Sequence, residues 1–70
     1  MNAVERAAPN EVDRRCGAVG CSELATWRIV RKPDTSLLVE RAYRCELHRN
    51  TVGNTRSMTV VRYVQLTRAA

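Results

Sequence analysis

The chain has 70 residues, of which 44% are hydrophobic and 27% charged, so it is long enough for one small folded domain. It carries twelve Lys and Arg residues against seven Asp and Glu residues, a formal net charge of +5, and all the cations but one are Arg. With no Phe, one Trp and two Tyr, a core of this size buries too little apolar surface to be stable without a cross-link. The composition therefore excludes a large enzyme and directs attention to the three cysteines.

The cysteines are expected to bind metal. Three cysteines cannot all pair within one chain, and a reducing compartment disfavours disulfides. No stretch approaches the roughly 18 consecutive apolar residues of a membrane span, and the N-terminus lacks the apolar core of a signal peptide. We therefore expect a cytoplasmic protein with no membrane partner.

The first clear pattern begins at the first cysteine. Residues 1–15 show neither a helical nor a strand period, and we interpret them as a mobile N-terminal tail. Cys16 then opens the segment Cys-Gly-Ala-Val-Gly-Cys, which ends at Cys21. Glycines 17 and 20 allow positive φ angles and let backbone N–H groups turn toward the sulfur atoms. The segment is interpreted as a zinc knuckle.

Two strand-like segments follow the knuckle. Residues 26–32 are rich in Trp, Ile and Val, and residues 37–43 form the second segment. Between them, residues 32–36 combine Pro with Asp and Ser, which favour turns. The pattern predicts a β-hairpin in which Trp27 and Ile29 share one face.

The rest of the chain predicts a short helix and a further strand. Residues 46–52 can form one or two helical turns, which Gly53 would close in a left-handed conformation. Residues 57–66 give the strongest strand pattern, in which Val60 and Tyr63 fall on opposite faces.

These elements together predict a small α+β zinc-stapled domain over residues 16–66. Its parts are a zinc knuckle, a β-hairpin, a short helix and an additional C-terminal strand. Residues 67–70 are expected to form a frayed C-terminus.

The three cysteines and the single histidine form two short pairs, Cys16-x4-Cys21 and Cys45-x2-His48. The predicted hairpin fills the interval between the pairs and can bring them together. Cys3His is a common structural zinc set, so we expect one structural Zn²⁺ bound by these four residues. In the alternative interpretation the cysteines are small buried hydrophobic residues and the histidine lies on the surface, which leaves the small core without a cross-link.

The order of knuckle, hairpin and helix resembles that of treble-clef zinc fingers over residues 16–52. The resemblance rests on Cys16, Cys21, Cys45 and His48, and it implies a helix whose first turn supplies the second ligand pair. The commonest treble-clef pattern has C-x2-C as its first pair and Cys as its fourth ligand, so a zinc ribbon is the second choice. The chain is also similar to uncharacterised small zinc-binding proteins of actinobacteria and their phages, which implies no defined activity.

Catalysis is not expected from this sequence. A catalytic zinc keeps one coordination position open, whereas four protein ligands are available here. The single histidine cannot serve both the metal and a Ser/His/Asp set, and there is no Gly-rich phosphate loop. We therefore expect a binding module and not an enzyme.

The excess of Arg indicates nucleic acid or an acidic protein surface as the partner. Arg presents a planar fork that suits phosphate and carboxylate groups. Contact with phosphates would depend on salt and be largely tolerant of sequence. The candidate nucleic-acid-binding residues are Arg28, Arg31, Lys32, Arg41, Arg44, Arg49 and Arg62.

A protein-interaction adaptor or inhibitor is the alternative function. The second face of the predicted strands carries more apolar surface than one short helix can cover, unless the N-terminal segment covers it as well. The candidate partner-binding residues on it are Val30, Leu38, Val61 and Tyr63. Such a face can bind a protein by strand addition, or pair two copies as a homodimer through the exposed edge of the C-terminal strand.

Overall fold

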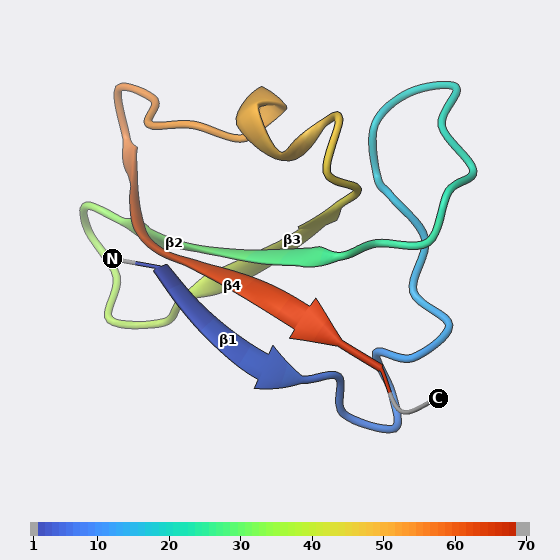
Figure 1. The fold of residues 1–70 in the computed structure, drawn as a ribbon. Helices are drawn as coiled ribbons and strands as arrows, with labels where there is room; N and C mark the ends of the chain where they lie inside the picture. Colours follow the sequence, from blue (N-terminus) through green and yellow to red (C-terminus); the bar gives the residue numbers. More distant parts are fainter. Residues whose placement is uncertain (1, 69–70) are drawn as a thin grey trace.

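Four strands form one mixed β-sheet in the computed structural model, which describes residues 2–68 (Figure 1). The strands are β1 (Asn2–Arg6), β2 (Trp27–Pro33), β3 (Glu40–Arg44) and β4 (Met58–Thr67), in the order β1-β4-β2-β3. β1 runs parallel to β4, whereas β2 runs antiparallel to both β4 and β3. A 3-10 turn, η1 (Arg49–Thr51), is the helical element of the described chain.

The N-terminal segment belongs to the sheet, so the prediction of a mobile tail over residues 1–15 was wrong. β1 pairs with β4 from Asn2 opposite Tyr63 to Arg6 opposite Thr67. The pairing continues into the next residue, because the N–H of Ala7 donates to the carbonyl of Thr67 at 2.7 Å. A five-residue edge strand has no extended apolar pattern of its own, and its partner lies at the other end of the chain. Met1 lies outside the described residues.

The C-terminal residues that the structure describes are also attached. Thr67 ends β4, and the guanidinium of Arg68 donates to the carbonyls of Val12 and Glu11 at 3.0 and 3.3 Å. The predicted frayed segment is therefore part of the fold at residues 67 and 68. Residues 69 and 70 lie outside the described part of the chain.

The predicted hairpin is present, with a later second strand. β2 agrees with the prediction to within one residue, but β3 begins at Glu40, so residues 37–39 lie in the connecting loop. The loop is held by its own polar groups: the N–H of Ser36 donates to the carbonyl of Pro33, and the Ser36 hydroxyl accepts the N–H of Leu38. These local hydrogen bonds compete with strand pairing and lengthen the turn.

A β-bulge in β4 changes which side chains meet the core. The register of β4 against β2 shifts between Val30 and Arg31, and Val61 is left without a partner on β2. An extra residue in one strand reverses its alternation beyond that point. Val60 and Tyr63 consequently pack against the same hydrophobic cluster, and the prediction that they face opposite sides was wrong.

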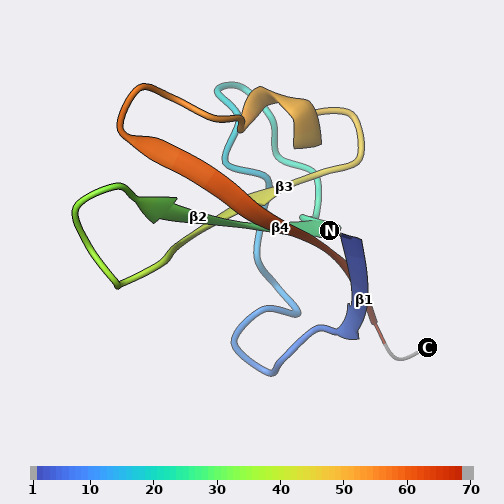
Figure 2. The ribbon, with the colours of Figure 1, turned by 90° about the vertical axis from the view of Figure 1, so that its left-hand side faces the viewer.

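The sheet has a small core on each face. On one face the buried residues are Trp27, Ile29 and Val52, with Ala42, Val60 and Tyr63 packed against them. On the other face the buried residues are Ala7, Val64 and Leu66, with Ala3 and Tyr43 packed against them. Figure 2 shows the sheet between η1 with its flanking segments and the loop that follows β1. The N-terminal segment thus covers the face of the sheet that carries Val64 and Leu66.

The predicted helix over residues 46–52 is reduced to one turn followed by η1. The N–H of His48 donates to the carbonyl of Cys45, and the N–H of Thr51 donates to the carbonyl of His48, both over three residues. The Thr51 hydroxyl also donates to that His48 carbonyl at 2.7 Å, which competes with helix propagation. Gly53 does not have a positive φ, so the expected left-handed cap is absent. The treble-clef helix is therefore missing, and the fold is a small α+β domain with almost no helix.

Candidate metal centre

The two Cys/His pairs converge on one point. The sulfur atoms of the three cysteines and a ring nitrogen of His48 all lie within 4.8 Å of one another. Cys16 and Cys45 are buried, and Cys21 and His48 are half-buried. The four residues predicted as ligands, Cys16, Cys21, Cys45 and His48, form a Cys3His cluster that can hold one metal ion.

The distances in this cluster fit four-coordinate binding. The Sγ atoms of Cys21 and Cys45 are 3.9 Å apart, and Nδ1 of His48 lies 3.2 Å from Sγ of Cys45 and 3.7 Å from Sγ of Cys16. In a tetrahedral site with zinc–sulfur bonds of about 2.3 Å, neighbouring sulfur atoms are roughly 3.8 Å apart. The three cysteines are free thiols, and Nδ1 is the ring nitrogen that faces them.

Backbone hydrogen bonds place the first knuckle against the end of β3. The N–H of Cys16 donates to the carbonyl of Glu23, and the N–H of Gly17 donates to the carbonyl of Tyr43, both at 2.8 Å. A Cβ atom on Gly17 would meet the guanidinium of Arg44, so this flexible side chain would have to move aside. Of the two knuckle glycines, only Gly20 has the expected positive φ, of 80°.

The thiols differ in acidity. Burial raises the pKa of Cys16. The backbone N–H groups of Ala18 and Cys45 and the neighbouring thiols outweigh this effect and lower the pKa to about 6. The backbone N–H of Glu23 lowers the pKa of Cys21, but burial and the other two thiols outweigh it and raise that pKa overall. Cys16 is therefore the first of these two to become the thiolate, the form that binds metal.

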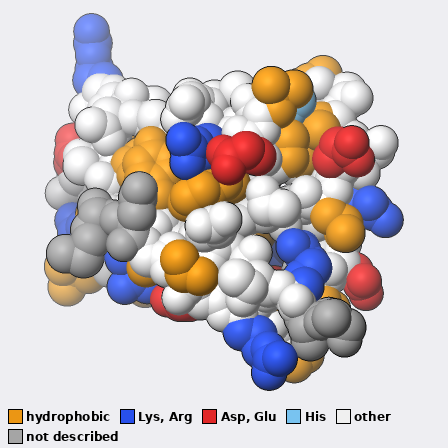
Figure 3. All heavy atoms as spheres, in the orientation of Figure 1, with side chains coloured by type: hydrophobic (Ala, Val, Ile, Leu, Met, Phe, Trp, Pro, Cys, Tyr) orange, Lys and Arg blue, Asp and Glu red, His pale blue; other side chains and the backbone are white. Residues whose placement is uncertain are grey.

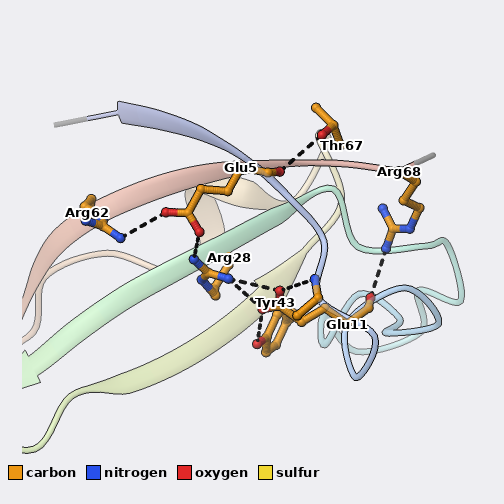
Figure 4. Close-up of polar contacts among 8 residues, drawn as sticks. Glu5, Glu11, Arg28, Tyr43, Arg62, Thr67 and Arg68 are labelled. Atoms are coloured by element: carbon orange, nitrogen blue, oxygen red, sulfur yellow. Dashed lines mark hydrogen bonds and ion pairs between the residues drawn. The ribbon is translucent and has the colours of Figure 1, made fainter.

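The sequence analysis did not identify a buried carboxylate, Glu11, which lies on the face of the sheet that carries Val64 and Leu66. Glu11 is only 3% exposed and accepts hydrogen bonds from Nη1 of Arg28, the hydroxyl of Tyr43 and the N–H of Ala8, at 2.7 to 3.0 Å (Figure 4). Arg28 also pairs with Glu5 on β1. This Glu11 network fastens the N-terminal loop to β2 and β3. Its members lie 17 and 32 residues apart, so no local sequence pattern reveals it.

The Glu11 network predicts a loss of stability in acid. Burial raises the pKa of Glu11, but the N–H of Ala8, Arg28 and Tyr43 lower it from the ordinary 4.5 to about 2. Because the folded-state pKa is depressed, this stabilisation is complete above about pH 4.5 and is lost as the pH falls toward 2. We expect the thermal midpoint of the wild-type chain to fall more steeply than that of Glu11→Gln in this window. The comparison is made at pH values where both chains still hold their metal, because the metal-free chain is not expected to unfold cooperatively. Parallel profiles over that range would contradict the assignment.

The seven predicted nucleic-acid-binding residues do not form one free surface. Four of them pair with carboxylates: Arg28, Arg31, Arg49 and Arg62. Arg49 also stacks over the ring of Trp27, with its Cζ atom 4.8 Å from the ring centroid. Arg44 donates to the carbonyl of Tyr43 and to the hydroxyl of Thr51. Within residues 2–68, Lys32 and Arg41 make no ion pair.

The four predicted partner-binding residues are dispersed as well. Tyr63 packs in the core beside Ile29, and its hydroxyl donates to the carbonyl of Val52. Val30 lies on the other face of β2, Val61 is at the bulge, and Leu38 is in the hairpin loop. These residues do not share the single apolar face that was expected.

The edge of the C-terminal strand is not open for pairing with a second copy. β4 lies inside the sheet, where β2 pairs with one side and β1 covers residues 63–67 on the other. Before that point, the side chain of Asn54 accepts the N–H of Val60 at 2.7 Å. The edge predicted to pair two copies is therefore occupied by β1 over residues 63–67, and the homodimer stays a prediction.

No protein-family model matches the chain, and no curated protein and no solved structure is significantly similar to it. In the described part of the chain, no helix is both long enough and apolar enough to cross a membrane.

Proposed function

We propose that the protein is a non-enzymatic binding module whose fold is held together by one structural Zn²⁺. The convergence of three thiols and one imidazole nitrogen carries this proposal. Thiolate and imidazole ligands suit zinc, whereas magnesium and calcium take oxygen ligands. Four protein ligands leave no coordination position for water or substrate, which assigns the ion a structural role.

The ion would join the two ends of the hairpin. Cys16 and Cys21 precede β2, and Cys45 and His48 follow β3, so one ion connects the segments that enter and leave this strand pair. Arg44, whose guanidinium lies against Gly17, would offset part of the negative charge of three thiolates. The thiols must stay reduced for this role, which is consistent with a cytoplasmic location.

The module acts by contact with a partner. Ion pairs neutralise four of the seven cations first assigned to nucleic acid, so a continuous Arg surface is not the feature that this geometry supports best. Contact through exposed apolar side chains is the other possibility, and the hairpin loop provides such side chains. We therefore favour contact through the hairpin loop, with the remaining cations in support.

Metal-free chain titrated with Co²⁺ is expected to develop the visible absorption of a tetrahedral thiolate site, saturate at one equivalent and lose the signal to Zn²⁺. His48→Ala and Cys16→Ser should each weaken binding strongly, because each removes one of four ligands. Val19→Asn is the matched control, since Val19 lies in the first knuckle with its side chain fully exposed. Binding that survives unchanged in Cys16→Ser would contradict the assignment.

A further inference from the structure

The loop between β2 and β3 presents three consecutive aliphatic side chains to solvent. Leu37, Leu38 and Val39 are 92%, 80% and 45% exposed. In the rest of the described chain, exposed aliphatic residues such as Val19 and Leu47 stand alone in the sequence, which is common on protein surfaces. A contiguous group of this kind usually marks a contact site. We call residues 37–39 the aliphatic tip.

The fold itself does not use the aliphatic tip. Neither hydrophobic core contains Leu37 or Leu38, and the hydrogen bonds of Ser36 hold the loop backbone. The loop lies at the opposite end of the molecule in Figure 1 from the knuckle of residues 16–21. The tip is therefore displayed by an ordered turn at a distance from the metal centre.

Cations lie on the segments that flank the aliphatic tip. Lys32 lies near the end of β2, and Arg41 lies near the start of β3 with its side chain at a pocket that Asn10 and Glu11 also line. Arg56 belongs to a turn beside the loop, since the N–H of Asp34 donates to the carbonyl of Ser57 at 2.9 Å. Lys32 and Arg56 against Asp34 leave a net charge of +1 at the base of the loop, as the nearby Arg31 and Glu40 neutralise each other. Figure 3 shows Lys and Arg side chains beside hydrophobic ones on the side of the molecule where this loop lies.

We propose that the aliphatic tip binds the surface of an anionic lipid bilayer, which departs from the expectation of no membrane partner, since that expectation rested on the lack of a membrane-spanning segment. Aliphatic side chains at such a surface enter the boundary between headgroups and acyl chains, while Lys and Arg remain at the level of the phosphates. The charge of the loop base is complementary to anionic headgroups, and the contact needs no membrane-spanning segment. The proposal rests on the metal-held fold proposed above, which keeps the hairpin in place.

Two other occupants fit the tip less well. Nucleic acid would contact the cations, but the three aliphatic side chains would add nothing to its binding. Among the described residues, no aromatic ring offers a stacking surface at the tip, because the rings of Trp27, Tyr43 and Tyr63 pack against the cores. A protein partner would need a groove matched to a convex loop, whereas a bilayer deforms around it. The combination of a convex aliphatic tip and a cationic base therefore favours lipid.

Co-sedimentation of the zinc-loaded chain with vesicles tests the proposal. We expect binding to vesicles of phosphatidylcholine with phosphatidylglycerol, little binding to pure phosphatidylcholine, and weakening by added salt. The double variant Leu37→Asn/Leu38→Asn should lower the partition coefficient about tenfold or more, because two side chains no longer enter the apolar region. Lys32→Gln and Arg56→Gln should each lower it about fivefold, and Val19→Asn should leave it unchanged.

Several outcomes would overturn the lipid proposal. One is that the chain fails to bind anionic vesicles at low salt, and another is that the double Asn variant binds them as tightly as the wild type does. A dimer in sedimentation velocity that this variant abolishes would assign the tip to a second copy. A DNA duplex bound more tightly than vesicles at equal phosphate concentration would assign the cations to nucleic acid. The cobalt spectrum of the same samples reports the metal site separately, so a metal-loaded chain that ignores vesicles counts against lipid alone.

Discussion

Cys45→Ser is expected to abolish the cooperative thermal unfolding of the chain at neutral pH. Metal binding to a structural zinc site contributes about 10–16 kcal/mol of apparent free energy, whereas the core of a domain this small rarely supplies more than about 5 kcal/mol. Cys45 is buried at the point where β3 leads into the second knuckle, residues 45–48, and its sulfur lies close to both Cys21 and His48. Without this ligand the remaining three would hold the ion too weakly to keep the hairpin ends together.

Calorimetry and circular dichroism with zinc present measure this effect. Serine is nearly the same size as cysteine, so little packing is lost and the effect reports the metal. The wild-type chain treated with a chelator should give the same spectrum as Cys45→Ser, and Val19→Asn should melt like the wild type. A native-like transition for Cys45→Ser in chelator would show that the two cores suffice without metal.

Glu11→Gln is expected to lower the free energy of unfolding by about 3 kcal/mol or more. Removal of one partner of a buried ion pair leaves the other charge uncompensated, at a cost of about 3–5 kcal/mol. Arg28 would retain Glu5, which is more exposed and also pairs with Arg62. The Gln side chain can still accept a hydrogen bond, so the loss reports mainly the charge.

The shift in the thermal midpoint should exceed about 10 °C in a domain of this length. Asp13→Asn is the matched control, because Asp13 is an exposed acid in the same N-terminal loop. If both variants melt within a degree of the wild type, the loop is not fastened by Glu11. A loss for Glu11→Gln alone would show that residues assigned to a tail from the sequence hold the sheet together.

The features that could be predicted are those with a local signature. The spacing of Cys16, Cys21, Cys45 and His48 identified the metal cluster because each pair closes its own short loop. β2 and β4 were located to within about one residue because each is a short segment rich in β-branched and aromatic residues. In both cases the signal lies within a few residues of the structure that it specifies.

The features that escaped prediction depend on distant partners. β1 is defined by pairing with β4 some sixty residues away, and it contains a single Val that remains exposed. In the sequence, Glu11 resembles the other acidic residues. Its buried role follows only from its contacts with Arg28 and Tyr43, which are distant in the chain. The bulge at Val61 depends on how β4 pairs with β2 and β1. The alternation of side chains within β4 alone does not predict it.

The parallel pairing of β1 with β4 has a consequence for the order of folding. During synthesis the hairpin and both knuckles leave the ribosome before β4 does, so zinc can organise them while β1 still has no strand beside it. β1 closes the sheet only after residues 63–67 arrive, and contacts of such high sequence separation form slowly. We therefore expect the nascent chain to carry its metal early and to complete its sheet late.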